Sequence, residues 1–220
     1  IESLQKQSRS NWEAIVGVDL AISNLTEKQV APASLSFKQD RRVRYVPITF
    51  GSTDRGGGGN GAGEVRNQII RNYATAKWVA FVDDDDTLSA DYIGHWETGR
   101  QHDQSADVII FRMESKSKRI LPPLAHGSTA SVTNVGISYA VRKELFVRKK
   151  NGIAFVPHPG EDYNFLKQGQ TCNATILISD CVTYFVRHEP SISRHQTSCR
   201  FENATISDRP PRKKPAENLG

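Results

Sequence analysis

The hydrophobic residues of this chain fall into short runs separated by polar segments, a pattern typical of buried strands that alternate with amphipathic helices. Residues 14–18 and 77–82 are apolar runs that predict buried strands, and residues 43–48 alternate like a strand in which Pro47 indicates an edge or an end. Residues 64–75 carry a one-sided apolar stripe that predicts a helix. This alternation predicts an α/β fold with a mostly parallel sheet and helices on both faces.

The second half of the chain is less regular. Strands are predicted over residues 108–113, 135–141, 174–179 and 182–187, with short helices at 143–146 and 160–167. We expect the polar segments between them to form loops over the carboxyl edge of the sheet. From Pro190 onward the chain is polar, which predicts one folded domain over residues 1–195 and a polar, basic tail over 196–220.

Four consecutive aspartates, Asp83 to Asp86, follow the predicted strand that ends at Val82. At a separation of about 5 Å and an effective dielectric constant of about 20, each like-charged pair costs about 3 kcal/mol. A hard divalent cation such as Mg²⁺ or Mn²⁺ relieves such a cluster, often together with a substrate phosphate. Aspartates also occur in solvated turns, but ligands bind at the carboxyl ends of strands in α/β proteins, which favours a metal site here.

Three further motifs carry candidate chemistry. Arg66 and Asn67 open the helix before the aspartates, where an arginine either pairs with a carboxylate or phosphate or is an ordinary surface residue. Glu161 and Asp162 begin a later helix, where they either complement its dipole or supply a general base for an attacking hydroxyl. His188 follows a strand and can offer an imidazole to a metal or a cation to a diphosphate.

Composition narrows the class of protein. The 220 residues are 37% hydrophobic, enough for the core of one α/β domain, and carry a net charge of +5. The basic residues are dispersed and lack interleaved aromatic residues, so nucleic acid is not an expected partner. An anionic substrate fits these residues as well, and a solvated surface is the default interpretation for most of them. No run approaches the roughly 18 apolar residues of a membrane-spanning helix, so membrane association is not visible in this chain. The glycine-rich run at residues 51–63 has no nucleotide-binding fingerprint and is interpreted as a flexible turn.

The cysteines and glycosylation sequons bear on the cellular compartment. Cys172, Cys181 and Cys199 allow one disulfide and leave one thiol, and the absence of a CxxC pair argues against a zinc site. Asn-X-Ser/Thr sequons favour a secretory lumen, although a cytoplasmic location stays open. The sequons lie at Asn24, Asn173 and Asn203.

The motifs lie in a recognisable order along residues 3–195. They are Asn11-Trp12-Glu13 before the strand that ends at Asp19, Arg66-Asn67, Phe81-Val82 with the aspartates, residues 136–146, and Gly160-Glu161-Asp162. In this order they resemble a family 2 glycosyltransferase of GT-A fold. The resemblance implies a Rossmann-like sheet and a metal-dependent, inverting transfer of a sugar from a nucleotide-diphosphate donor, UDP being expected. The acceptor is expected to be a hydroxyl of a carbohydrate or glycoconjugate.

The same resemblance implies roles for individual residues. Asp162 matches the catalytic base, and Glu161 lies beside it for acceptor contacts. Asp83 and Asp85 fill the positions of the DxD motif, and with His188 they are the expected ligands of Mn²⁺ or Mg²⁺. The residues expected to bind the donor are Asp19, Arg66, Asn67, Asp83 and Asp84.

One feature departs from the family. The first strand of a GT-A domain lies in the middle of the sheet, and here the chain begins in the helix after it, so this central strand is expected to be absent. Such a gap leaves backbone N–H and C=O groups of the neighbouring strands without hydrogen-bond partners. The alternative function is therefore a catalytically silent nucleotide- or sugar-binding domain of the same fold. A metal-dependent nucleotidyltransferase is a third reading, disfavoured because the glycine-rich run comes too late in the chain.

Overall fold

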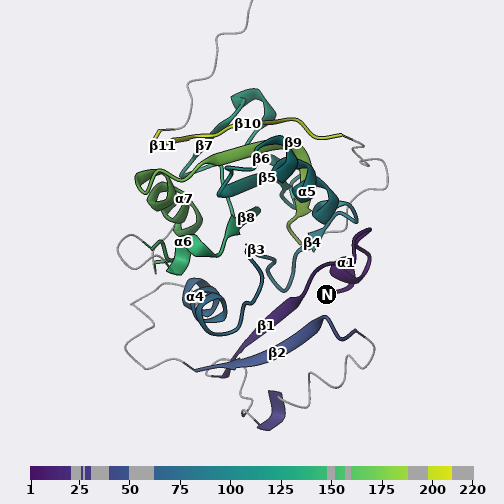
Figure 1. Ribbon diagram of the computed structural model, residues 1–220. Helices are drawn as coiled ribbons and strands as arrows, with labels where there is room; N and C mark the ends of the chain where they lie inside the picture. The colour runs from purple at the N-terminus through teal and green to yellow at the C-terminus, as the bar shows by residue number, and fades with distance from the viewer. Residues whose placement is uncertain are drawn as a thin grey trace, which may run out of the picture.

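The structure is a computed structural model that describes residues 1–20, 26, 28–30, 40–49, 62–147, 152–156, 160–187 and 198–209. Over these residues it is an α/β arrangement in which helices flank a central sheet, as predicted (Figure 1). No helix among the described residues is long and apolar enough to cross a membrane. Of the predicted features, the glycine-rich run up to residue 61, His188, Asn24 and residues 210–220 lie outside the described residues.

Strands β1 (Ala14–Asp19) and β2 (Val43–Ile48) form a parallel two-stranded sheet, drawn at the bottom of Figure 1. Helix α4 (Ala62–Asn72) packs directly on β1. A Cβ atom added to Gly17 would lie 2.6 Å from Ile69 Cδ1 and 2.8 Å from Val65 Cγ1. The absence of a side chain at Gly17 therefore sets how closely the helix approaches the strand.

The larger sheet has the strand order β10-β9-β5-β8-β3. Strands β5 and β9 are parallel, whereas the β10–β9, β5–β8 and β3–β8 pairs are antiparallel. Two short strands, β4 and β6, add antiparallel pairs to β9 and β5. The bounds are β3 Trp78–Ala80, β4 Thr87–Leu88, β5 Val108–Glu114, β6 Ile120–Leu121, β8 Tyr139–Arg142, β9 Ile176–Phe185 and β10 Phe201–Asn203.

The prediction of a mostly parallel sheet is therefore wrong for this sheet, which is mixed. All seven residues of β5 are buried. A strand covered on both faces has a continuous apolar sequence whatever the direction of its neighbours, so the pattern located the strands without giving their directions.

Strands β1 and β3 belong to different sheets, although one crossover through α4 joins β2 to β3. Within the described residues, β1 pairs with β2 alone and β3 pairs with β8 alone. In this part of the chain, the β-structure is thus interrupted between β1 and β3.

The remaining helices pack around the larger sheet. They are α1 Glu2–Gln5, α5 Tyr92–His102, α6 Glu144–Val147, α7 Glu161–Thr171 and the 3₁₀ helix Leu124–His126. A cluster of aromatic rings connects α7 to the end of β3. The Phe165 ring stacks on Tyr139 at 5.5 Å and on Phe155 at 4.5 Å, and Phe81 meets both Tyr139 and Phe155 edge-on. These contacts fix the start of α7 relative to the carboxyl end of β3.

Residues 198–209 belong to the folded domain, so the predicted domain end at residue 195 is wrong. Strand β10 pairs with β9, and β11 (Thr205–Ser207) pairs in parallel with β7 (Thr129–Ser131). Phe201 and Ile206 bury their side chains, and these isolated apolar residues in a polar stretch gave too weak a pattern to predict strands. The Asp208 carboxylate also accepts hydrogen bonds from Tyr163 and Lys167 of α7.

One disulfide is present, as the cysteine count allowed. Cys181 in β9 is bonded to Cys199, which precedes β10, and their Cα atoms are 5.4 Å apart. Cys172 is the cysteine that lies outside this disulfide. The disulfide therefore fastens the last described segment of the chain to the larger sheet.

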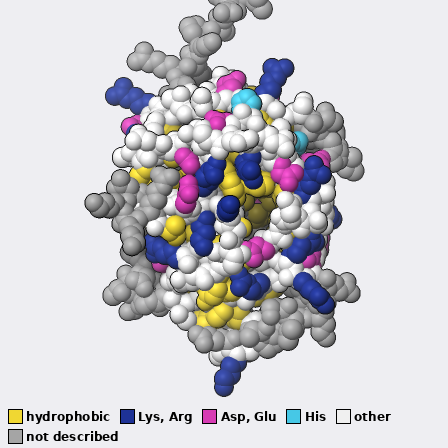
Figure 2. Space-filling view, in the orientation of Figure 1, with side chains coloured by type: hydrophobic (Ala, Val, Ile, Leu, Met, Phe, Trp, Pro, Cys, Tyr) yellow, Lys and Arg dark blue, Asp and Glu magenta, His cyan; other side chains and the backbone are white. Residues whose placement is uncertain are grey.

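Figure 2 shows Lys and Arg side chains around a hollow near the middle of one face of the molecule, with hydrophobic side chains on its floor. The basic residues are mixed with acidic ones and form no continuous stripe on this face.

We expect Gly17→Ala to lower the free energy of unfolding by about 1–3 kcal/mol, because α4 must shift away from β1 to admit the methyl group. Denaturant unfolding would measure the change. Gly94→Ala in α5 is the matched control, since its added Cβ meets nothing nearer than Ser8 Oγ at 4.0 Å. That control should be neutral or stabilising by up to about 1 kcal/mol. Equal stability of Gly17→Ala and the unsubstituted chain would contradict the packing described.

Candidate active site

Arg66 brings the two predicted acidic motifs together. Its Nη2 donates a hydrogen bond of 2.6 Å to Asp83 Oδ1, and its Nη1 donates one of 2.6 Å to Glu161 Oε1. Asp162 Oδ1 lies 3.9 Å from Nη1. The guanidinium also packs over the Phe155 ring, 5.3 Å from its centroid. Side chains from α4, the carboxyl end of β3 and the start of α7 thus meet at one buried cation.

Two glycines allow this approach. Gly160 precedes α7 with φ +80°, a left-handed conformation that favours glycine, and places Glu161 and Asp162 in the first turn. Gly63 faces Glu161 from α4. A Cβ atom at Gly63 would lie 2.6 Å from Glu161 Oε2 and 2.8 Å from Phe155 Cβ. A side chain at Gly63 would therefore displace the carboxylate that Arg66 binds.

Burial and charge shift the ionisation of this cluster. Burial opposes the positive charge of Arg66, but Asp83, Asp162 and Glu161 outweigh it and raise the pKa of the guanidinium. Burial raises the pKa of Asp162 to about 6, with Arg66 opposing the shift and the other two carboxylates adding to it. Burial also raises the pKa of Glu161, which Arg66 moderates. Asp162 can therefore both hold and release a proton close to neutral pH.

Asp162 has one carboxylate oxygen that is not used by the fold. Its Oδ1 is buried and accepts no hydrogen bond from any described residue. Its nearest cation is Arg66, at 3.9 Å and beyond hydrogen-bond distance. An oxygen in this state is available to a proton that comes from outside the chain.

The four consecutive aspartates have different environments. Asp84 is exposed, and Asp85 Oδ2 accepts a 2.6 Å hydrogen bond from Arg187 Nε. Asp86 is buried and accepts a hydrogen bond from the backbone N–H of Arg187 at 3.0 Å. Burial raises the pKa of Asp86. Two arginines, Arg66 and Arg187, thus supply part of the positive charge that the aspartate run was predicted to need.

A cavity of about 410 Å³ opens beside this turn. Its lining combines carboxylates with the basic side chains of Lys116 and Arg187. The lining residues are Asp83, Asp85, Asp86, Ser115, Lys116, Ser117, Val186 and Arg187. The turn at residues 115–117 follows buried strand β5 and was not a predicted part of the site, because its sequence shows only polar residues between two strands. Its position after β5 was the signal that could have indicated it.

Asp83 and Asp85 are the described residues of the predicted ligand set that could hold a hard divalent cation. Both carboxylates come from one turn, both line the cavity, and their side chains are 43% and 49% exposed. Carboxylate oxygens are the ligands that Mg²⁺ and Mn²⁺ prefer. The third predicted ligand, His188, lies outside the described residues.

Asn67 occupies a place different from the predicted one. Its amide is buried, donates to the Phe155 carbonyl at 2.8 Å and accepts from the Phe155 N–H at 3.0 Å. This pair of hydrogen bonds fastens residues 152–156 to α4. The Asn67 amide therefore stabilises the fold and is not placed to bind a nucleotide-sugar donor. Asp19 ends β1, in the smaller sheet.

We expect Arg66→Met to lower the free energy of unfolding at pH 7.5 by about 3–5 kcal/mol, because three carboxylates lose their shared cation. Denaturant unfolding would measure this, and the loss should shrink at pH 5 as carboxylates take up protons. Arg9→Met is the control. The Arg9–Glu97 pair is 2.9 Å long but lies at the surface, and its loss should change the stability by less than about 1 kcal/mol. If Arg66→Met changed the free energy of unfolding by as little, Arg66 would not be the cation that stabilises the three carboxylates.

The pKa of Asp162, raised from 3.8 to about 6, predicts a pH-dependent effect of Asp162→Asn on stability. Between these two values the unfolded chain has lost the proton that the folded chain retains, so the stability of the unsubstituted protein falls as pH rises through this window. Asp162→Asn removes the effect. The variant should equal the unsubstituted protein near pH 4 and exceed it at pH 7.5 by up to about 3 kcal/mol. Thermal or denaturant unfolding at both pH values would measure this difference, and equal stabilities at pH 7.5 as well as at pH 4 would show that the fold does not raise the pKa of Asp162.

No protein-family model matches the chain, and no curated protein matches it. Among solved structures, its fold is similar to that of the crystal structure of residues 1–349 of TarS from S. aureus, a glycosyltransferase. The TM-score is 0.61, the sequence identity is 19%, and the match covers 84% of this chain. It covers 54% of the TarS chain, so the present chain spans about half of that structure. The fold of this chain is therefore similar to a glycosyltransferase fold.

Proposed function

We propose that this chain carries an inverting glycosyltransferase domain that moves a sugar from a nucleotide-diphosphate donor, a UDP-sugar, to a hydroxyl of a carbohydrate or glycoconjugate. The observation that carries the proposal is the cluster around Arg66. It brings the Asp83 carboxylate and the Asp162 carboxylate to one guanidinium. This adjacency, on a fold similar to that of a glycosyltransferase, supports a donor site at Asp83 beside a general base at Asp162.

Asp162 is the base in this proposal. Its unprotonated carboxylate takes the proton of the acceptor hydroxyl while the hydroxyl oxygen bonds to the anomeric carbon of the donor. The bond from that carbon to the donor phosphate breaks, and its electron pair leaves on the nucleoside diphosphate. One in-line displacement inverts the anomeric centre. Glu161, paired with Arg66, keeps the start of α7 in place beside the acceptor.

The cavity beside the aspartates is the proposed donor site. Asp83 and Asp85 would hold Mn²⁺ or Mg²⁺, and a bound cation of this kind neutralises charge on a leaving diphosphate. Lys116 and Arg187 line the same cavity and provide cationic donors that suit phosphate oxygens. Arg187 must release Asp85 for this carboxylate to bind a metal, since the two are paired at 2.6 Å. Asp19 and Asp84 remain predicted contacts of the nucleoside.

A catalytically silent nucleotide- or sugar-binding domain is the second candidate. The break between β1 and β3 and the pairing of Asp85 with Arg187 favour it, because both separate the present arrangement from a complete donor site. This candidate predicts donor or acceptor binding without turnover.

Calorimetric titration of UDP, with and without Mn²⁺, tests the donor site. We expect manganese-dependent binding that Asp85→Ala weakens by at least about tenfold, as expected for loss of a metal ligand. Asp162→Asn should bind UDP like the unsubstituted protein and lose at least about 100-fold in turnover with a UDP-sugar. Turnover should rise with pH through the Asp162 pKa of about 6.

Asp103→Asn, at the far end of α5, is the control for both measurements and should change neither. Binding without turnover by the unsubstituted protein across a donor and acceptor screen would favour the silent domain. If folded protein binds none of UDP, GDP, CDP and dTDP, the glycosyltransferase proposal fails.

A further inference from the structure

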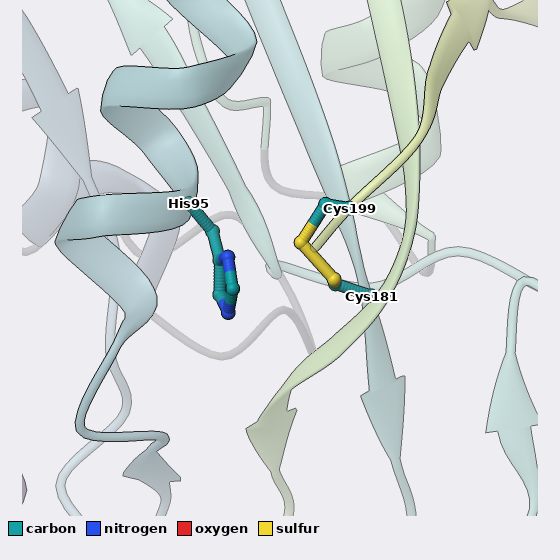
Figure 3. Close-up of side chains that lie close together, drawn as sticks. All are labelled: His95, Cys181 and Cys199. Atoms are coloured by element: carbon teal, nitrogen blue, oxygen red, sulfur yellow. A yellow bond between two sulfur atoms is a disulfide. The ribbon is translucent and has the colours of Figure 1, made fainter. Parts of the chain in front are cut away.

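A second cluster of metal-ligating side chains lies away from the candidate active site. His95 projects from α5, Cys181 lies in β9, and Cys199 precedes β10. One ligand atom from each residue falls within a group whose members are at most 4.8 Å apart. Figure 3 shows the His95 ring beside the disulfide, on the side of α5 that faces the larger sheet. Three segments that are distant in sequence therefore present two sulfurs and one imidazole to the same place.

The dimensions suit a tetrahedral thiolate site. With Zn–S bonds of about 2.3 Å and Zn–N bonds of about 2.0 Å, tetrahedral angles place ligand atoms about 3.5–3.8 Å apart. The two cysteine Cα atoms, 5.4 Å apart, can accommodate two thiolates at this separation once the S–S bond is broken. Two Cys and one His, with water as the fourth ligand, form a known type of zinc ligand set.

His95 has the properties of an available ligand. Its ring is partly buried, and no described residue forms a hydrogen bond with either ring nitrogen. The ring lies beside both sulfur atoms, from where one of its nitrogens can reach a metal ion that the two thiolates hold.

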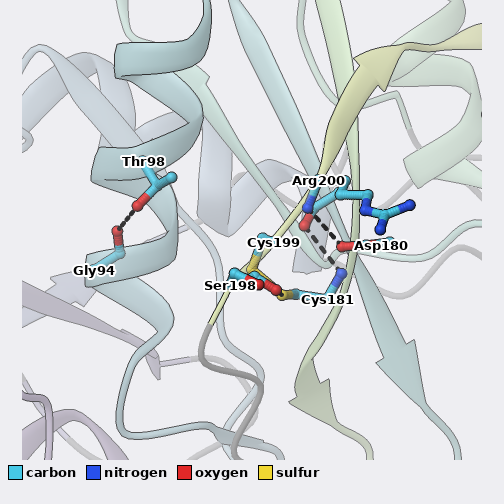
Figure 4. The surroundings of a disulfide bond; sticks show 8 residues. Gly94, Thr98, Asp180, Cys181, Ser198, Cys199 and Arg200 are labelled. Atoms are coloured by element: carbon cyan, nitrogen blue, oxygen red, sulfur yellow. Dashed lines mark hydrogen bonds between the residues drawn. A yellow bond between two sulfur atoms is a disulfide. The ribbon is translucent and has the colours of Figure 1, made fainter.

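The chain around the two cysteines is held by other contacts. Figure 4 shows the backbone N–H of Arg200 donating to Asp180 Oδ1, at 2.8 Å. The backbone N–H of Asp180 in turn donates to the Arg200 carbonyl, and Phe201 of β10 pairs in register with Ser179. These contacts do not involve sulfur, so they can keep both cysteines beside His95 when the disulfide is opened.

We propose that reduction of the Cys181–Cys199 disulfide creates a zinc site formed by these two cysteines and His95. A phosphine or dithiol reductant supplies two electrons that break the S–S bond, and two protons give two thiols. Binding of Zn²⁺ then releases both thiol protons as two Zn–S bonds form. The oxidised and the zinc-bound states each link β9 to the segment 198–209.

This linkage reaches α7. Asp208, nine residues after Cys199, accepts hydrogen bonds from Tyr163 and Lys167, close to Asp162 in the same helix. Zinc would therefore preserve, under reducing conditions, an attachment that the disulfide provides under oxidising conditions. The site itself requires no activity of the chain, so its test is independent of the proposed transferase function.

The test uses Co²⁺ as a spectroscopic probe of the zinc site. The protein carries Cys172→Ser, so that the two cysteines of the cluster are its only thiols, and is reduced with a phosphine. We expect one Co²⁺ per chain, thiolate-to-cobalt charge-transfer absorption, d–d bands of a tetrahedral site, and loss of both on addition of Zn²⁺. The oxidised protein should show none of these bands.

Variants locate the ligands. Cys199→Ser should abolish the charge-transfer band, and His95→Ala should weaken Co²⁺ binding by at least about tenfold. His95→Gln serves as a second variant if His95→Ala does not fold, and circular dichroism monitors folding. His102→Ala, two turns further along α5, is the control and should bind Co²⁺ normally. The proposal is overturned if the reduced protein shows no tetrahedral thiolate spectrum, if it unfolds even with Zn²⁺ present, or if the His95 variants bind Co²⁺ unchanged.

Discussion

The buried charge of Arg66 is the interaction on which the candidate active site depends. Three carboxylates from two distant segments surround this guanidinium, and its side chain is only 12% exposed. In a medium of low polarity, neither the cation nor the carboxylates would be stable without the other. The ion cluster therefore stabilises the observed arrangement of α4, the end of β3 and the start of α7, because separating these elements would leave Arg66 and its carboxylates unpaired.

Contacts of the uncharged residue Phe155 hold the charged cluster in place. Phe155 packs beneath Arg66, stacks on Phe165 of α7 and is fastened to α4 through Asn67. The segment 152–156 thus packs between α4, which carries Arg66, and α7, which carries Glu161 and Asp162. Beside this segment, Asp162 Oδ1 lies 3.9 Å from Arg66, beyond hydrogen-bond distance, and the burial of its carboxyl group raises its pKa more than Arg66 lowers it. The raised pKa of Asp162 therefore depends in part on the aromatic packing around Phe155.

The sequence predicted the parts of this structure that depend on local pattern. The α/β class, a strand followed directly by the run of aspartates, a helix that carries Arg66, and the positions of Glu161 and Asp162 at a helix start could all be predicted. The strand before the aspartates is not buried as predicted, because Trp78 and Val79 are half-buried and Ala80 is exposed. Strand direction was not, because the fully buried β5 looks the same with parallel or antiparallel neighbours. The strand of Phe201 was missed because one buried ring in a polar stretch has no periodicity to detect. The pairing of Arg187 with Asp85 depends on tertiary contacts across 102 positions, which no local pattern encodes.

The close contact between Gly63 and Glu161 makes an uncharged position part of the charge cluster. A methyl group at Gly63 would lie 2.6 Å from Glu161 Oε2 and 2.8 Å from Phe155 Cβ. To admit it, the Glu161 side chain must turn or the segment that carries Phe155 must move, and either change alters how Arg66 meets its carboxylates. Alanine at this position would therefore change the electrostatics of the site while leaving every charged residue in place.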